Sequence, residues 1–497
     1  MKHYTNLMAY QKGISALRSV ESVVYWDQAT VMPNMAAGYR GEQMAELAKV
    51  VHARVTSAEY SDLLAAAEQE VAHASLDDPE RVNVAKLKRS FEKQKLLPED
   101  FVVKFSRARV AGSKAWESAK KEQNFNIFAE PLHRLVEMAK EKAAFFSGRS
   151  TPYDVLLEDF EYGTTSQDLD LVFNPLKSGL IPLIKKFSAL ADIEAPRLGG
   201  REFDVRKQEK LSLELLGELG FAKEDGYIAT SSHPFSCTLG PSDFRITTRY
   251  LKNELMSSFM ATAHEVGHSL YERGLPKEHF GTPLGEAASA GVHESQSLFW
   301  ENRVARSRPF LKSWLGKFQE AFPTAFEGAD AESFYRAVNR VEPGFIRVEA
   351  DEVTYSMHII IRYEIEKSLI NEGLQVSEIP EIWNEKYKDY LGISPGNVAE
   401  GCLQDVHWSE ALFGYFPSYA LGHLMSAQLT ESMEKDLGSM DQLLLSGSYD
   451  KIRSWLQGSI HRLGNLKDAP DLILDISGQR LSEKPFLRYL NNKFVLD

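Results

Sequence analysis

Apolar side chains recur at helical spacing over most of the first 190 residues, where Leu, Ala, Lys and Glu dominate. The pattern changes between Tyr227 and Tyr250, where Thr, Ser, Ile, Phe and Tyr are interrupted by Pro and Gly, as is typical of strands and loops. After residue 285 the helical spacing returns and continues to the end. The sequence therefore predicts a mainly α protein with a small β-sheet.

One helix is predicted with defined ends, over residues 255 to 274. Its first half carries apolar residues at helical spacing: Leu255, Met256, Phe259, Met260 and Ala263. Gly274 followed by Pro276 predicts where it stops. We expect the strand segment from Asp243 to Thr247 to form a sheet edge beside this helix, where an extended peptide could pair with it.

Two histidines lie four positions apart on this predicted helix, His264 and His268, with Glu265 between them. This spacing puts both imidazoles on one face, where they can reach one metal ion while the glutamate projects beside it as a base. The alternative is a pair of buried histidines that only satisfy hydrogen bonds in the helix core. The intervening glutamate favours the metal site.

A catalytic zinc ion takes three protein ligands and keeps one position for water. Glu294 is the best candidate for the third, because it lies in a second predicted helix between Gly285 and Arg306. The connecting loop is rich in Pro and Gly, so the second helix can turn back and pack against the first. Spacing alone leaves Glu286 and His293 as competitors.

These ligands predict metal-assisted hydrolysis. Zinc held by His264, His268 and Glu294 would lower the pKa of a bound water to about 7. Glu265 would accept the proton of that water and return it to the leaving amine. Cobalt or manganese could replace zinc at such a site.

The zinc motif is one of several sequence blocks that resemble the M32 family of thermostable zinc metallocarboxypeptidases, the Taq carboxypeptidase-like enzymes. The opening Tyr25-Trp26-Asp27-Gln28 and the length also match this family, so the resemblance covers essentially the whole chain. Six blocks appear in order: 233–235 (His-Pro-Phe), 243–247 (Asp-Phe-Arg-Ile-Thr), 264–268, 293–296 (His-Glu-Ser-Gln), 346–351 (Ile-Arg-Val-Glu-Ala-Asp) and 401–408 (Gly-Cys-Leu-Gln-Asp-Val-His-Trp).

The resemblance implies a ligand set and a fold. It assigns the third zinc ligand to Glu294 and leaves Glu286 outside the ligands. It also implies a mainly α, two-lobed zincin of the gluzincin type, with a deep active-site groove and a small β-sheet beside the zinc helix. A homodimer is expected on the same ground.

A carboxypeptidase must hold the terminal carboxylate of its substrate, and the planar fork of arginine suits this task. Arg347 and Arg245 stand in family blocks and are our candidates. The alternative for each is a structural ion pair, with Asp351 or Asp243 respectively. For Arg347 the resemblance favours substrate binding.

Other residues of the blocks are expected to contact the substrate or the reacting carbonyl. The expected substrate-binding group includes Asp243, Gln404 and Asp405, and it includes His233 unless that residue only orders the loop before Pro234.

In related zinc peptidases a histidine and a tyrosine lie near the oxyanion. By this resemblance His407 is paired with Tyr419, or with Tyr415 as the second choice. The alternative is that these tyrosines are core and groove-wall aromatics.

Composition narrows the class of protein further. The chain has 497 residues, 43% hydrophobic content and a net charge of −13, which argues against a nucleic-acid surface. Cys237 and Cys402 are too few for a disulfide framework. No linker, signal-peptide core or apolar run of roughly 18 residues is present. We therefore expect one catalytic domain over residues 1–497, in the cytoplasm.

Together these features predict a zinc metallocarboxypeptidase that releases single C-terminal residues from short peptides. The nearest alternative is a zinc oligopeptidase or dipeptidyl-carboxypeptidase, whose carboxylate anchor lies farther from the metal. A non-catalytic, zinc-containing peptide-binding protein is a third possibility. Glu265 argues against it, since binding alone needs no base.

Overall fold

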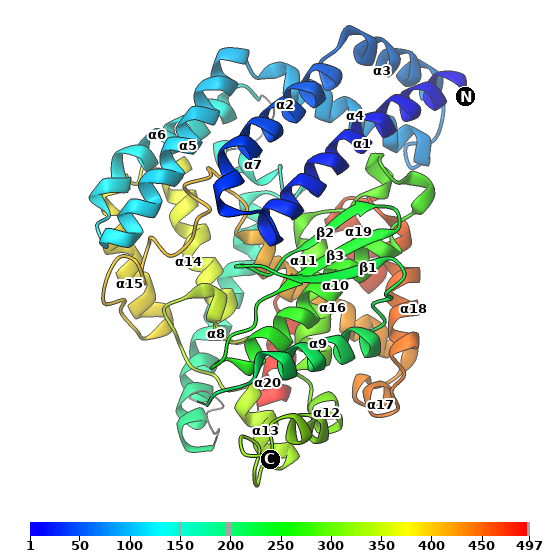
Figure 1. Ribbon diagram of the computed structural model, residues 1–497. Helices are drawn as coiled ribbons and strands as arrows, with labels where there is room; N and C mark the ends of the chain where they lie inside the picture. Colours follow the sequence, from blue (N-terminus) through cyan, green and yellow to red (C-terminus); the bar gives the residue numbers. More distant parts are fainter. Residues whose placement is uncertain (147, 149–150, 195–200, 495–497) are drawn as a thin grey trace.

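The computed structural model describes residues 1–146, 148, 151–194 and 201–494. The chain is mainly helical with one small sheet on a face of the body, and it forms an N-terminal helical lobe above that larger body (Figure 1). The helices of the lobe are α1 (Lys2–Thr30), α2 (Ala37–Val55), α3 (Ala58–Val71) and α4 (Pro79–Leu96).

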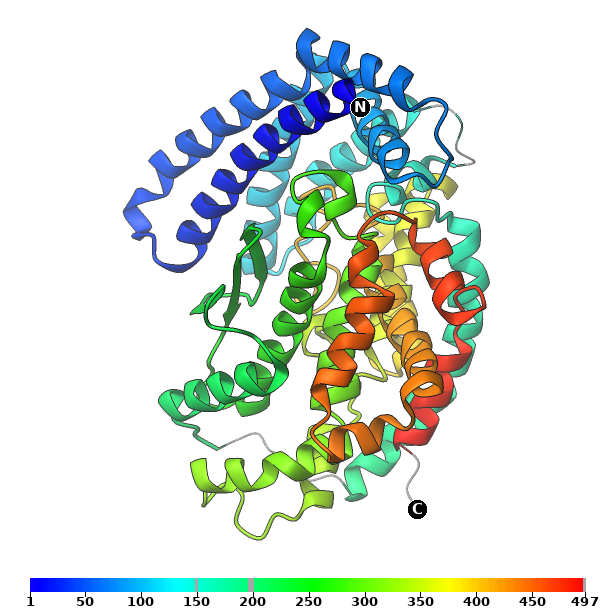
Figure 2. The same cartoon turned by 90° about the vertical axis from the view of Figure 1, so that its right-hand side faces the viewer.

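The N-terminal lobe has a hydrophobic core separate from that of the body. Leu7 and Ile14 of α1 pack there with Leu64 of α3 and Leu87 of α4, and all four are buried. The lobe contacts the body where α1 meets strand β2 and where α4 meets the short helix η3 (Pro283–Gly285). In Figure 2, α1 and α2 run side by side and extend over the sheet. The expected two-lobed helical architecture is confirmed.

The body contains the remaining helices, packed around one large apolar core. Their bounds are α5 (Glu99–Glu122), α6 (Asn126–Ala144), α7 (Pro152–Leu157), α8 (Ser166–Glu194), α9 (Val205–Leu219), α10 (Leu255–Gly274), α11 (Ala290–Leu298), α12 (Arg308–Ala321), α13 (Ala331–Val338), α14 (Tyr355–Lys367), α15 (Ile379–Leu391), α16 (Pro417–Leu437), α17 (Met440–Leu445), α18 (Tyr449–Ser459), α19 (Ala469–Ser477) and α20 (Lys484–Phe494).

The sheet has three strands, β1 (Gly226–Thr230), β2 (Ser236–Gly240) and β3 (Asp243–Thr248), in the order β1-β3-β2. β3 pairs parallel with β1 and antiparallel with β2, and it packs against α10. The expectation that residues 243–247 form a sheet edge is therefore wrong. A period-two pattern reports which face of a strand is buried but not which strands become its neighbours.

The helix that carries both histidines, α10, ends at Gly274 as predicted. The second predicted helix begins at Ala290 rather than near residue 285, because Ser289 adopts an extended conformation and accepts a hydrogen bond from the Val292 amide. It continues without a break into a π-helical turn, η4 (Phe299–Ala305). α11 packs against α10 and α16.

The expectation of continuous helix after residue 285 is also too simple. Residues 392–416 form turns and loops, with positive φ at Ala411 (54°) and Gly414 (90°). A Cβ on Gly414 would lie 2.8 Å from the Leu157 amide nitrogen, so this loop approaches α7 too closely for a side chain. Gln404, Asp405 and the other expected residues of the 401–408 block lie in this segment.

Candidate active site

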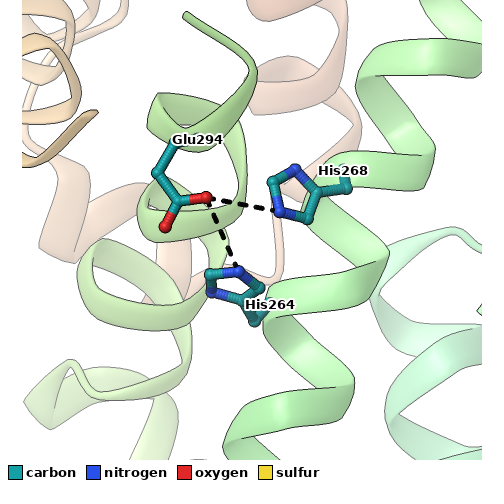
Figure 3. Close-up of side chains that lie close together, drawn as sticks. All are labelled: His264, His268 and Glu294. Atoms are coloured by element: carbon teal, nitrogen blue, oxygen red, sulfur yellow. Dashed lines mark ion pairs between the residues drawn. The ribbon is translucent and has the colours of Figure 1, made fainter. Parts of the chain in front are cut away.

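His264, His268 and Glu294 lie together in the body, where α10 and α11 cross (Figure 3). One ligand atom from each residue falls within 4.8 Å of the others. The Glu294 Oε2 atom is 3.9 Å from Nε2 of His264 and 3.4 Å from Nε2 of His268. Two imidazoles and one carboxylate are a donor set that suits zinc, so the residues present fit the metal that the sequence predicts.

A second carboxylate orients the first histidine. Nδ1 of His264 lies 3.0 Å from Oε2 of Glu301, whose other oxygen accepts a hydrogen bond from Arg306 at 3.0 Å. A carboxylate on the outer nitrogen of a metal-binding histidine fixes the ring and its tautomer. Sequence reasoning missed Glu301, although its position seven residues after Glu294 on a predicted helix was a usable signal.

The charges of the cluster favour a cation. Burial opposes ionisation of Glu294, yet the two histidines hold the pKa of its carboxyl at about 2. Burial lowers the pKa of His268 to about 4, so its imidazole is neutral and can donate a lone pair. His264 is the exception, because Glu294 and Glu301 outweigh its burial and raise its pKa to about 10. An incoming metal ion must displace that proton.

Glu265 is buried and faces the same cavity as the cluster. Its Oε2 atom has no hydrogen-bond partner among the described residues. Burial raises the pKa of its carboxyl to about 7. A carboxyl group with a free oxygen and a pKa near neutrality is suited to exchanging protons with a neighbouring water.

The two competitors for the third ligand lie nearby but outside the cluster. His293 stacks on the His268 ring with centroids 4.4 Å apart, and its Nε2 atom lies 2.9 Å from Oε1 of Glu272. Glu286 lines the cavity without joining the group of ligand atoms.

The cavity in front of the cluster has a volume of about 740 Å³. This space is large enough for several residues of an extended peptide. Its walls include parts of α4, the loop after α7, the start of β2, the 286–290 segment and the start of α16. Besides the cluster they include Arg89, Glu158, Asp159, Phe160, Tyr162, Pro234, Phe235, Ser236, Glu286, Ser289, Tyr415, Ser418, Tyr419 and Asn465.

The two predicted tyrosines, Tyr415 and Tyr419, line this cavity, and their rings contact each other with centroids 5.3 Å apart. His407 does not line it. Its Nε2 atom lies 3.4 Å from the Tyr419 hydroxyl, and its ring packs on Phe416. His407 therefore lies behind the two tyrosines, in contact with the Tyr419 hydroxyl and stacked on the Tyr415 ring.

Arg347 lies behind Tyr419, with its guanidinium carbon 4.9 Å from the centre of that ring. It is buried, pairs with Asp405 at 2.9 Å and donates to the Tyr355 hydroxyl at 2.9 Å. Arg362 pairs with the other oxygen of Asp405 at 2.6 Å. Arg347 therefore forms its ion pair with Asp405, whereas the sequence had suggested Asp351 as the partner in such a pair.

The remaining predicted residues lie farther from the cluster. Gln404 supports the Arg347 loop, accepting from the Arg347 amide at 2.8 Å. Arg245 binds both oxygens of Asp243, at 2.8 and 2.9 Å, and lines a separate depression on the sheet. His233 is exposed next to Pro234, which does line the cavity.

A partly buried metal-ligand cluster, an adjacent free carboxyl group and a peptide-sized cavity in a helical molecule define a metallopeptidase. The family model described as "Carboxypeptidase Taq (M32) metallopeptidase" matches residues 6–494, and the chain belongs to this family. It is a metallocarboxypeptidase, a hydrolase of C-terminal peptide bonds that depends on a divalent metal.

Relatives match over nearly their full length. "Carboxypeptidase 1" of Bacillus subtilis is 39% identical over 97% of this chain and 96% of its own. "Thermostable carboxypeptidase 1" of Thermus thermophilus is 37% identical over 99% and 98%. The solved carboxypeptidase structure from Pyrococcus furiosus superposes with a TM-score of 0.95 at 32% identity, covering 100% of this chain and 99% of that one.

Within residues 1–146, 148, 151–194 and 201–494, no helix combines the length and apolar character needed to span a bilayer.

Proposed function

We propose that this enzyme is a zinc carboxypeptidase whose metal is held by His264, His268 and Glu294 and whose general base is Glu265. The proposal rests chiefly on one observation, the cluster of these three ligands beside the free carboxyl oxygen of Glu265 in one cavity. When bound, zinc supplies an activated water and polarises the carbonyl of the scissile bond.

The residues around the cluster have separate roles in this proposal. Glu301 holds the His264 ring so that Nε2 faces the metal position. Glu265 takes a proton from the attacking water and passes it to the leaving amine, for which its raised pKa is suited. Tyr419, with Tyr415 beside it, donates a hydrogen bond to the developing oxyanion. His407 positions the Tyr419 hydroxyl.

The terminal carboxylate of the peptide is drawn toward the side of the cavity where Arg347 lies. Arg347 and Arg362 share the single carboxylate of Asp405, so this buried ion-pair group carries a net positive charge. Direct contact with a substrate carboxylate would require Tyr419 or the Arg347 side chain to move. Arg245 is less suited to this role, because its guanidinium group already donates hydrogen bonds to both carboxylate oxygens of Asp243.

A homodimer is proposed as the oligomeric state. Apolar side chains at the tip of the α1–α2 hairpin are exposed, including Val31 (72%), Met35 (100%) and Tyr39 (69%). Clustered exposed apolar side chains are typical of an interface. A cytoplasmic location, a single domain over residues 1–497 and exchange of zinc for cobalt or manganese stay predictions from the sequence.

The proposal is tested by incubating a short N-blocked peptide with zinc-loaded protein and following the products by mass spectrometry. Stepwise loss of single C-terminal residues, abolished by chelation and restored by zinc, is expected. Release of dipeptides would instead favour the oligopeptidase alternative. Equal cleavage of the C-terminally amidated peptide would contradict recognition of the terminal carboxylate.

A further inference from the structure

Glu286 is a carboxylate in the cavity that the proposed mechanism does not use. It begins the extended segment between η3 and α11, and its side chain is open to the cavity that contains the metal cluster. Its carboxylate makes no hydrogen bond or ion pair with any other described residue. An acid in this position is available to a ligand.

The charged groups nearest to Glu286 come from three helices. Arg18 on α1 and Lys86 on α4 attract it, and Glu272 on α10 repels it. Lys86 is held by Asp468 at 2.8 Å, and Arg18 lies on the exposed face of α1. Desolvation by the cavity walls raises the pKa of the Glu286 carboxyl to about 7 despite the two cations, although the residue is still exposed to solvent. Its charge is therefore incompletely compensated.

Glu286 and Tyr419 line parts of the cavity that different elements form, the 286–290 segment and the start of α16. Glu272, which acts on Glu286, pairs with His293 against the His268 ring. On the other side, Tyr419 lies between the cavity and the positive group of Arg347, Arg362 and Asp405. A peptide bound with its C-terminal carboxylate toward Tyr419 would extend its upstream residues toward Glu286.

We propose that Glu286 binds a cationic group on the N-terminal side of the scissile bond and so makes the enzyme prefer substrates with a positive charge there. The cation is an ammonium or guanidinium group, from the free N-terminus of a short peptide or from a lysine or arginine side chain. This inference rests on the proposed function, because the direction of the peptide follows from where its carboxylate binds.

The test compares kcat/KM for matched peptides. One pair is N-acetylated and carries lysine or norleucine before the C-terminal residue, which changes the charge while keeping the aliphatic chain. A second pair is an all-alanine tripeptide with a free or an acetylated N-terminus. Each pair is measured with the zinc-loaded wild type, with E286Q and with E278Q, whose altered residue is exposed and outside the cavity lining.

We expect the wild type and E278Q to favour the charged member of at least one pair by about fivefold, as for a partly exposed ion pair. E286Q should lose that preference while cleaving the neutral peptides as the wild type does. The pair that responds tells whether the N-terminus or the side chain is bound. Equal ratios in the wild type and E286Q for both pairs would overturn the inference, whereas failure of the wild type to cleave the neutral peptides would overturn the proposed function instead.

A pH series provides a second readout that a purely structural role would not produce. The other charged groups at this end of the cavity, Arg18, Lys86, Arg89 and Glu272, are the same in the wild type and in E286Q. Because the pKa of Glu286 lies near 7, the lysine preference of the wild type should increase over this range. The preference of E286Q should be small and constant, and a parallel increase in both proteins would contradict the inference.

Discussion

The carboxyl groups around the candidate metal site differ in their partners, and those partners separate their roles. Glu294 faces both histidines, Glu301 holds the outer nitrogen of His264, and one oxygen of Glu265 has no partner among the described residues. These partners set the pKa of each carboxyl group, which is about 2 for Glu294 and Glu301 and about 7 for Glu265. Of these three, Glu265 alone has a pKa near neutrality and is suited to exchanging a proton there.

Replacing Glu265 by glutamine should keep the metal and abolish nearly all turnover. Glutamine has almost the same shape but cannot accept the proton of the attacking water, so kcat should fall by about 10²–10⁴-fold. Steady-state kinetics with metal content measured by mass spectrometry would check this. Wild-type activity in the metal-loaded variant would remove Glu265 from the role of base.

Replacing Glu301 by glutamine should weaken metal binding more than chemistry. The amide keeps the size of the side chain but removes the charge that orients His264, and loss of such an outer partner lowers metal affinity by about 10–100-fold. Zinc titration against a competing chelator would measure the change. E327Q, at an exposed position, is the control and should bind zinc as the wild type does. An unchanged affinity for E301Q would mean that the hydrogen bond is incidental.

At the scale of elements, the site depends on how closely three helices approach. A Cβ on Gly267 of α10 would lie 2.6 Å from the Gln296 carbonyl oxygen and from Cα of Ser297. A Cβ on Gly422 of α16 would lie 2.7 Å from Cγ of Glu294. Both glycines therefore allow α11 to lie against its neighbours and bring Glu294 to the histidines.

Replacing Gly267 by alanine should force α10 and α11 apart. The clash is with backbone atoms that cannot rotate away, so we expect a loss of about 1–3 kcal/mol in the free energy of unfolding, together with weaker metal binding. Denaturant unfolding and zinc titration would check both effects. Gly316→Ala on α12, where a Cβ meets nothing within 4 Å, should be neutral or stabilising by up to about 1 kcal/mol. Unchanged stability of G267A would show that the helices can adjust without cost.

Glu161 connects the segment after α7 to the two helices beside the site. It is fully buried, and its Oε1 atom accepts from the Gly291 amide of α11 and from the Ser418 hydroxyl of α16. Burial raises the pKa of its carboxyl from 4.5 to about 7. The folded protein therefore binds a proton that the unfolded chain has released between these pH values.

This difference predicts a falling stability as pH rises. Because the folded pKa is the higher one, the contribution is fully present below pH 4.5 and decreases through pH 7, by up to about 3 kcal/mol. E161Q should reduce the pH dependence of the unfolding free energy between pH 5 and 7 by part of that amount, since other buried carboxyl groups contribute too. Urea unfolding at several pH values would measure it, and identical slopes in both proteins would contradict the assignment.

At the scale of the whole molecule, the lobes and their charges decide what can enter. The N-terminal lobe has its own apolar core and meets the body at β2 and η3, next to the cavity. Arg89 of the lobe lies over the ring of Tyr162 of the body, and both side chains line the cavity. The positive group of Arg347, Arg362 and Asp405 lies behind Tyr419, on the side of the cavity that we propose for the C-terminal carboxylate of the peptide.

Metal removal should destabilise the molecule as a whole, because the three ligands come from helices at the centre of its main core. At a free zinc concentration about 1,000-fold above the dissociation constant, binding should stabilise the folded state by about 4 kcal/mol. Calorimetry of zinc-loaded and chelated protein would record this as a higher melting temperature with metal. The variant E294Q should show a smaller difference, and no difference in the wild type would mean that metal binding does not depend on the native fold.

Features that depend on local spacing follow from the amino-acid sequence alone. The histidines on a helix ending at Gly274, the second helix with Glu294, and the mainly α class follow from residues a few positions apart, whose relative placement a helix fixes. The family was also readable from the sequence, because its blocks are short strings of adjacent residues. The structure and the comparisons confirm these predictions.

The way in which distant segments meet is visible in the three-dimensional structure alone. It placed β3 in the centre of the sheet, Asp405 rather than Asp351 beside Arg347, and Glu301 on His264. It also placed Glu294, and neither His293 nor Glu286, with the two histidines. These pairings depend on the packing of helices and loops far apart in the chain, and no local period in the sequence records which side chains that packing brings together.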